Sequence, residues 1–480
     1  MHRALGTVLS EWPFLGPSAP EPLVPCEADL PLVFLKYPVR LSRESPANLS
    51  QPELILESMI SSTHSLASGK SIPELGLACS LFPLLRVTRS VAFASIALLG
   101  SVVNLSLHAA STRPEVLESI VRLDVPEIDG EVHGGGLPLA IGVESIQVTR
   151  ANRTYPELSD GMGWTYSHAP MLAYAHGHFY VEYLSNPFSE HAPPGVTLVT
   201  RSSDGRNWET PNVVFPTYFV RPGSIYSTDT GMAMMHQRMG FYLAPNGRLL
   251  VLGHYGHAPS PYGEKGFGRV VREAKADGSY GPIYFVRYNS LAGADESNTR
   301  YPLYVRSPDA GFVEACDSLL QDKLTTMQWF DEDRSEDGFY TAPKVDLNGK
   351  ALEAPSIYHR KDGAVVAMFK HGWAALSTDK GESWSAPAEV PGMITGGAKT
   401  WVQRTADDRF ALVYNPAERV RWPLVVTTSD DGEVFDDMLL VNGEVPPRRF
   451  FGRAKDRGMQ YTRGISEGNG TPPGDDLWIT

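Results

Sequence analysis

From about residue 143 to its end, the chain consists of short apolar runs separated by polar turn signals. Residues 171–174, 179–184 and 196–200 are three such runs, each as long as a β-strand, and a turn at residues 176–178 joins the first two. Similar runs follow at residues 248–253, 268–273, 283–288, 356–359, 365–369, 400–404, 410–414 and 424–428. Residues 317–320 predict the start of a short helix in an inserted loop. The pattern predicts an all-β fold of many short strands.

Two turn sequences near the C-terminus repeat one pattern, Ser/Thr-x-Asp-x-Gly-x-x-aromatic. Its Asp and aromatic positions are Asp379 and Trp384 in the first copy, and Asp430 and Phe435 in the second, 51 positions later. An Asp carboxylate can bond back to the turn amides, and Gly accepts a positive φ. A third copy at residues 202–208 is one residue short when it is aligned on Asp204. We therefore interpret these residues as structural turn residues.

This repeated motif is the Asp box, and the chain resembles the sialidase-like (BNR-repeat) β-propellers over residues 143–480. It resembles more loosely the propeller polysaccharide lyases that act on rhamnose–glucuronate or ulvan linkages. The resemblance implies a single all-β propeller, and at about 50 residues per blade the chain would form six or seven blades.

The first 110 residues differ from the rest. Arg86 and Arg89 precede an uncharged apolar stretch at residues 90–103, and residues 109–111 are small, as at a signal-peptide cleavage site. We predict an N-terminal extension, residues 1–111, that ends in a signal-peptide-like segment at about 85–111, followed by the propeller at 112–480. Residues 1–84 would then precede the true start, and the protein would be secreted or periplasmic. A single membrane anchor is the alternative for the same stretch.

The C-terminal residues 475–480 have the pattern of a strand that is entered but not finished. Propellers close by pairing their last strands with the first blade, because an open sheet edge is a liability. We therefore expect a truncated last blade.

Composition narrows the partners. The net charge of −13 argues against nucleic acid and anionic membrane surfaces, and we expect no membrane contact in the mature form. The resemblance implies a poly- or oligosaccharide substrate, and we expect a monomer. Cys316 is the single cysteine of the predicted propeller, which excludes a disulfide framework there. The chain has no CxxC and no HExxH motif, so no cofactor is expected, and nothing in the sequence indicates structural calcium.

Four segments are denser in polar and aromatic residues than a structural strand requires: 163–170, 234–239, 254–257 and 461–470. Their catalytic candidates are His168, His236, His254 and Tyr255. The candidates for substrate binding are Gln237, Arg238, Arg272, His371, Tyr461 and Arg463. Alternation places His236 and Arg238 on one side of their strand.

Two mechanisms fit this inventory. In β-elimination on a uronate, His168 or His236 removes the proton beside the carboxylate, Arg238 neutralises that carboxylate, and Tyr255 or His254 protonates the leaving oxygen. The resemblance to retaining sialidases instead implies a Tyr nucleophile and three Arg residues, but His168-Ala169-Pro170 stands where those enzymes have Arg-Ile-Pro. The sequence therefore favours a secreted lyase that acts on an acidic glycan. A sialidase-like exo-glycoside hydrolase is the alternative, and a non-catalytic glycan-binding propeller is the second alternative.

Overall fold

The computed structural model describes residues 29–35, 119–129, 131–190, 192–220, 231–233, 240–256, 266–328, 352–418, 420–444 and 458–480. The chain divides into two compact units, Met1–Arg40 with Glu118–Thr480, and Leu41–Leu117. The second unit, with the predicted signal-like segment at about 85–111, lies outside the described residues, and so do His236, Gln237 and Arg238. Within the described part of the chain, no helix is long and apolar enough to cross a membrane.

The described residues form four sheets in which strands that are consecutive in the sequence are neighbours and antiparallel. Each sheet is named here by its first strand. The β4 sheet comprises β4 (Tyr166–Ala175), β5 (His178–Asn186), β6 (Val196–Ser202) and β7 (Asn212–Phe215). The β10 sheet comprises β10 (Gly240–Leu243), β11 (Leu249–Gly256), β12 (Gly266–Ala274) and β13 (Tyr284–Tyr288). The β14 sheet comprises β14 (Ser356–His359), β15 (Val365–Phe369), β16 (Trp373–Ser377) and β17 (Ala388–Glu389). The β18 sheet comprises β18 (Trp401–Arg404), β19 (Phe410–Tyr414), β20 (Leu424–Ser429) and β21 (Val434–Asn442), and β2 (Arg122–Leu123) extends it in parallel.

A further sheet has the strand order β22 (Leu477–Ile479), β1 (Asp29–Leu35) and β3 (Val143–Arg150). Arg463 and Thr480 exchange two backbone hydrogen bonds, which add residues 463–464 to its β22 edge. Residues 477–479 of the predicted unfinished strand are therefore paired. Their partner β1 belongs to the segment that the sequence separates from the propeller.

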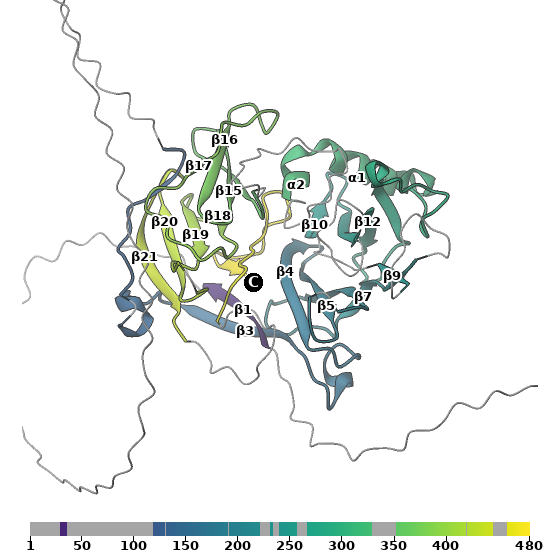
Figure 1. The fold of residues 1–480 in the computed structure, drawn as a ribbon, viewed down its shortest axis with the longest axis horizontal. Helices are drawn as coiled ribbons and strands as arrows, with labels where there is room; N and C mark the ends of the chain where they lie inside the picture. The colour runs from purple at the N-terminus through teal and green to yellow at the C-terminus, as the bar shows by residue number, and fades with distance from the viewer. Residues whose placement is uncertain are drawn as a thin grey trace, which may run out of the picture. The chain divides into compact units, whose positions relative to one another are not determined.

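Apolar clusters pack neighbouring sheets against one another. Val199 and Val251 share a cluster between the β4 and β10 sheets, and Val366 and Leu412 share one between the β14 and β18 sheets. Trp478 packs with the β4 sheet, whereas its neighbours Leu477 and Ile479 pack with the β18 sheet. Figure 1 shows the sheets arranged around a centre, close to which the C-terminus lies. The fold is an all-β, propeller-like arrangement, and six or seven blades remains a prediction.

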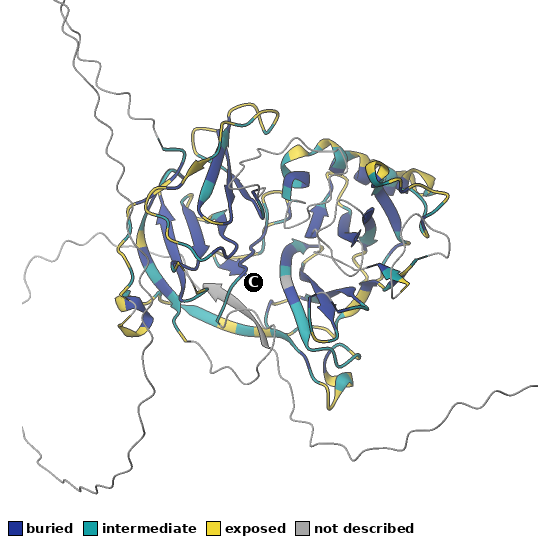
Figure 2. Cartoon of the chain, viewed as in Figure 1, coloured by how far each residue is buried: buried dark blue, intermediate teal, exposed yellow. Residues whose placement is uncertain are grey.

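The strands form because most of their residues are apolar on both faces. In β11, Leu249 and Val251 face the cluster shared with the β4 sheet, whereas Leu250 and Leu252 face the opposite side. Figure 2 shows this double burial as dark blue strands that are joined by more exposed loops. Burial on both faces explains why the apolar runs are continuous rather than alternating.

Two helices follow β13 in the chain. The helix predicted at residues 317–320 begins earlier, as α1 (Ala310–Gln321), because the Asp309 side chain accepts a hydrogen bond from the Phe312 amide and caps it. Helix α1 buries Phe312, Ala315 and Leu319 against the β10 sheet, and α2 (Lys323–Met327) packs Met327 against the β14 sheet. Short elements complete the described part: β8 (Tyr218–Phe219), β9 (Met232–Ala233), and 3-10 turns at His133–Gly136, Pro156–Leu158, Ser290–Ala292 and Tyr304–Arg306.

The first Asp box forms the hairpin turn after β16. Asp379 accepts hydrogen bonds from the Ser377 hydroxyl and from the Ser383 amide and hydroxyl, at 2.8, 2.8 and 2.5 Å. The Ser383 hydrogen bonds lower the pKa of Asp379 to about 2. Trp384 packs against the apolar cluster of the β14 sheet.

The second box departs from the predicted alignment. Asp431 accepts the amides of Glu433 and Val434 at 2.7 and 3.0 Å, and the Ser429 hydroxyl at 2.9 Å. The prediction that Asp430 performs this role was wrong, because the turn is one residue shorter and places the carboxylate directly before Gly432. Burial acts to raise the pKa of Asp431, but these hydrogen bonds outweigh it, and the pKa lies below its usual value. Phe435 is fully buried, as a residue that covers the hairpin should be.

The third copy follows the same shorter pattern. Asp204 accepts the amides of Arg206 and Asn207, each at 2.8 Å, and the Ser202 hydroxyl at 2.9 Å. The sequence that seemed one residue short therefore forms a complete turn. These carboxylates are occupied by their own hairpins, and the site must lie elsewhere.

Candidate functional site

A group of charged side chains gathers at one edge of the sheets. In an antiparallel meander, the start of the first strand and the end of the second lie at the same edge. The β14–β18 contact, in which the Ser356 hydroxyl accepts the Val402 amide at 2.9 Å, places the first strands next to one another. The charged residues at this edge are in β4 (His168), two or three residues before β14 and β18 (Glu353, Lys399), and in the connections after β5, β15 and β19 (Glu190, Lys370, Arg421).

Tyr461 lies at the centre of this group. Its ring centroid is 5.3 Å from Lys370 Nζ, 4.8 Å from Lys399 Nζ and 4.7 Å from the Arg421 guanidinium carbon. Tyr461 and Lys370 are buried, and Lys399 is 0% exposed. We call these four residues the Tyr461 cluster. Two lysines and an arginine around one ring give this place a positive character, which Glu353 offsets in part at Lys370, and such a place can attract an anion.

A proton-transfer pair adjoins the cluster. His168 Nε2 lies 3.3 Å from Glu190 Oε1, and both side chains are buried. The His168 ring meets the Tyr461 ring edge-on, with centroids 5.1 Å apart, and the Tyr166 ring lies 5.5 Å away on β4. An imidazole held by a carboxylate in this way can give or take a proton beside a bound ligand.

The backbone is strained at the same place. Tyr461, His371 and Ala354 have φ values of 61°, 65° and 53°, which side chains with a Cβ rarely adopt. Each of the three is a member of the site or directly follows one, because Ala354 follows Glu353 and His371 follows Lys370. Lys370 Nζ is also 3.5 Å from Glu353 Oε2. His371 and Gly372 form the tight turn between β15 and β16, which accounts for the positive φ of His371. The strain at Tyr461 and Ala354 is of the kind that occurs at functional sites, where the surrounding structure holds an unfavourable conformation.

Residues around Tyr461 fix its position. Asn415 donates from Nδ2 to the Met459 carbonyl at 3.0 Å, and Arg421 donates to Gln460 Oε1 at 2.9 Å. A Cβ on Gly464 would lie 2.2 Å from Trp401 Nε1, so this approach of the backbone to β18 requires glycine.

The structure brings three of the predicted residues together. His168 and Tyr461 are in ring contact, and Arg463 is two residues from Tyr461. Arg463 is buried, donates to the Thr400 carbonyl at 3.2 Å and lies 5.5 Å from the Trp401 ring, so it joins the Tyr461 segment to the start of β18. His371 is exposed beside Lys370.

Other predicted residues lie in the β10 sheet with structural contacts. Tyr255 is fully buried in the apolar core and donates to the Pro216 carbonyl at 2.8 Å, and burial raises the pKa of its hydroxyl well above the usual value. Its prediction as a proton donor was therefore wrong. Arg272 donates to the carbonyls of Val214 and Gly281, so its prediction as a substrate ligand was wrong too, and burial lowers its pKa. His254 is buried on β11 opposite Arg269 of β12.

The sequence interpretation missed Lys399, Glu190, Arg421 and Glu353. One signal was available, because Lys399 lies two residues before the strand β18, where a lysine has no structural reason to be buried. The other three lie in irregular connections, and no strand pattern could place them. In the described part of the chain, no three His, Cys, Asp or Glu residues are grouped to hold a metal ion.

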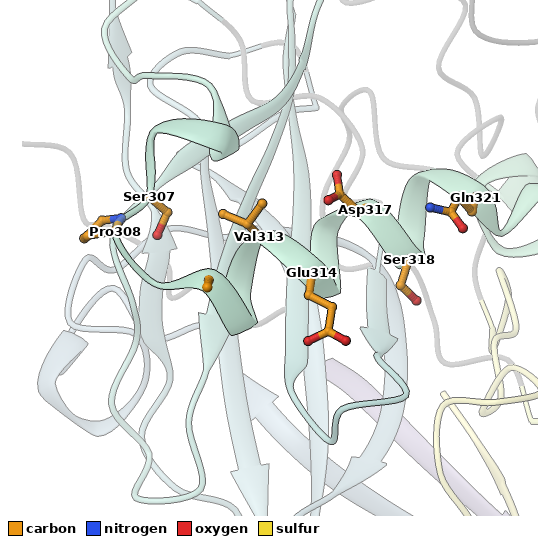
Figure 3. Close-up of a pocket in the computed structure, with 8 residues that line it drawn as sticks. Ser307, Pro308, Val313, Glu314, Asp317, Ser318 and Gln321 are labelled. Atoms are coloured by element: carbon orange, nitrogen blue, oxygen red, sulfur yellow. The ribbon is translucent and has the colours of Figure 1, made fainter.

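A hollow of about 540 Å³ lies on α1, well separated in sequence from the Tyr461 cluster. Figure 3 shows Glu314, Asp317 and Gln321 along it. Asp317 accepts a hydrogen bond from the Tyr304 hydroxyl at 2.6 Å, and Glu314 accepts one from Asn246 at 3.3 Å. These contacts join α1 to Tyr304 and Asn246. None of the residues that line the hollow is a lysine or an arginine.

Comparisons with known proteins agree with this architecture. The family model "Beta-prop_BT_1020:-like, N-terminal beta propeller" matches residues 120–345. A solved structure titled "Sialidase" is 39% identical, aligns with a TM-score of 0.67 and covers 75% of this chain. The chain spans 34% of the length of that protein. No curated protein matches the chain.

Two further solved sialidases are more distant. The Hadza microbial sialidase Hz136 is 10% identical with a TM-score of 0.40, and covers 67% of this chain and 68% of its own. The Trypanosoma rangeli sialidase is 11% identical with a TM-score of 0.37, and covers 74% of this chain and 57% of its own. TM-scores this low do not support a conclusion about the fold, so the comparison rests on the family model and the 39% identical structure. Together with the Asp-box turns, these two likenesses agree with a sialidase-like β-propeller fold.

Proposed function

We propose that the chain is an exo-acting glycoside hydrolase that releases a terminal sugar with a carboxylate group from a glycan. The observation that carries this proposal is the Tyr461 cluster, in which Lys370, Lys399 and Arg421 face one ring within 5.3 Å. A carboxylate of the substrate would be attracted to these cations. The likeness to a sialidase supports hydrolysis over the elimination that the sequence favoured.

In this proposal the cluster binds the sugar carboxylate and so orients the anomeric carbon toward His168. Protonated His168, held by Glu190, gives its proton to the glycosidic oxygen as the bond to the anomeric carbon breaks. A water molecule adds to the anomeric carbon, and its released proton returns to His168. The aromatic edge of Tyr461 keeps the imidazole in place.

A β-elimination lyase is the second candidate, because His168 and Tyr461 lie with ring centroids 5.1 Å apart beside the cations. An imidazole that removes the proton next to a carboxylate, and a phenol that protonates the leaving oxygen, is the pair that elimination needs. Elimination leaves a double bond in the product, whereas hydrolysis does not.

The two reactions are separated by their products. The protein is incubated with aryl glycosides of acidic sugars, with sialylated oligosaccharides and with uronate polysaccharides. Release of a free sugar acid without ultraviolet absorbance supports the proposal. Absorbance of an unsaturated uronate supports the lyase and rejects hydrolysis. Measurable glycan binding without any product, in wild type and at every pH tested, rejects both and favours a binding module.

Variants show whether the reaction belongs to this site. His168→Ala should abolish turnover, whereas Lys361→Met should leave it unchanged, because Lys361 pairs with Asp408 at the surface beyond the opposite end of β14.

Secretion through residues at about 85–111 is part of the proposal, and N-terminal sequencing of the mature protein tests it.

A further inference from the structure

The connection between β5 and β6 carries Glu190 on one side and an exposed aromatic ring on the other. Glu190 is buried and reaches His168, whereas Phe188, two residues earlier, is 69% exposed. Single exposed apolar residues are common on protein surfaces, so the exposure alone means little. What distinguishes Phe188 is its position two residues before Glu190, on the same connection as this member of the proton-transfer pair.

The connection is held in shape by hydrogen bonds. Asn186 donates from its buried Nδ2 to the Ala192 carbonyl at 3.0 Å, and the Ala192 amide donates to the Ser189 carbonyl at 3.0 Å. The Pro187 carbonyl, directly before Phe188, accepts both the amide and the hydroxyl of Thr165, at 3.1 and 3.2 Å. The backbone around Phe188 is therefore fixed, and its ring does not fold back into the core.

A second exposed ring lies on the neighbouring connection, between β3 and β4. Tyr155 is 57% exposed, and its amide is fixed by Asn152 Oδ1 at 2.9 Å. Arg153 donates to the Thr165 hydroxyl at 3.1 Å, so Thr165 links this connection to the one that carries Phe188. Both connections lie at the edge where β4 begins, which is the edge of the Tyr461 cluster.

We propose that Phe188, with Tyr155 on the neighbouring connection, forms an aromatic platform for the sugar ring on the leaving-group side of the glycan. One face of a pyranose carries mainly C–H groups and packs on an aromatic ring, and exposed rings on fixed loops give this contact with little loss of conformational freedom. The platform rests on the proposed hydrolase function. It extends that function from one terminal acidic sugar to at least two consecutive sugars, with the cleaved bond between them.

The test compares two substrates with the same acidic sugar. One is an aryl glycoside with a small leaving group, and the other is an oligosaccharide with a sugar as the leaving group. Phe188→Ala should raise KM for the oligosaccharide about three- to tenfold and leave KM for the aryl glycoside unchanged. Phe188→Trp should restore the oligosaccharide KM. Leu291→Ala is the matched control, because Leu291 is 68% exposed in the turn after β13.

The outcomes separate the platform from the proposed reaction. An unchanged oligosaccharide KM in Phe188→Ala, or an equal rise for both substrates, overturns the platform while the hydrolase stands. If wild type cleaves neither substrate, the hydrolase fails. Calorimetric binding of the oligosaccharide then decides the platform, which is rejected if Phe188→Ala binds as tightly as wild type.

Discussion

Replacing Lys399 by methionine tests the carboxylate-binding role most directly. Lys399 is 0% exposed, and its Nζ lies 4.8 Å from the Tyr461 ring centroid. A hydrogen bond between charged groups contributes about 1.5–3 kcal/mol. Because about 1.4 kcal/mol corresponds to a factor of ten in rate, Lys399→Met should lower kcat/KM by about 10- to 100-fold. Lys370 and Arg421 remain, which is why the loss should not be complete.

The same substitution should change stability little. Methionine keeps the length and most of the volume of the lysine stem, which limits the loss of packing. Removing one of three like charges around the ring also relieves repulsion from Lys370 and Arg421. The predicted signature is thus a large loss of activity with a melting temperature close to that of wild type.

The assay is initial-rate kinetics on an acidic aryl glycoside, with thermal unfolding followed by circular dichroism on the same samples. Lys361→Met is the control, a lysine-to-methionine change at a 41% exposed side chain. Full activity in Lys399→Met would refute the carboxylate-binding role. A loss of activity that is accompanied by a large fall in melting temperature would show that Lys399 stabilises the fold instead.

Three further predictions concern the fold. Asp431→Ala should lower the free energy of unfolding by about 1 kcal/mol, whereas Asp430→Ala should change it by less than about 0.5 kcal/mol; equal effects in a denaturant titration would contradict the shorter turn. Gly470→Ala should prevent folding or cost more than about 3 kcal/mol of stability, since its Cβ would lie 1.7 Å from a carbonyl oxygen. Gly468→Ala should cost about 1 kcal/mol, because no atom lies within 4 Å of its Cβ. Similar melting temperatures for the two variants would refute this difference. The pKa of Asp379 is lowered to about 2, so ionised Asp379 stabilises the folded state above the ordinary Asp pKa, and this stabilisation is lost as the pH falls toward 2. Acid unfolding curves should therefore show that Asp379→Asn loses less stability than wild type between pH 4 and about 2.

Several features of the fold could be predicted from local pattern. Apolar runs bounded by turn residues identified strands such as β5, β11 and β19, because a strand buried on both faces must be apolar along its length. The Asp-box sequences identified a propeller, because each turn is built by residues within eight positions of one another. Even here, Asp431 and not the predicted Asp430 accepts the hydrogen bonds of the second turn. The hydrogen bonds decide the length of a turn to within one residue, and a sequence pattern does not contain them.

The site depended on contacts between sheets. His168 and Tyr461 were recognised as polar residues at strand ends, but residue type alone did not separate them from Tyr255, whose hydroxyl bonds to a backbone carbonyl in the core. His168 and Tyr461 are 293 positions apart in the chain, and Glu190 and Lys399 join them from two further connections.

By itself, the sequence determined the kind of strand, the hairpin turns and the all-β fold class, because these follow from neighbours in the chain. The tertiary structure decided which charges meet, because a ring of sheets brings the starts of their first strands together whatever their separation in sequence. The cations around Tyr461 exist as a site only after that ring is formed.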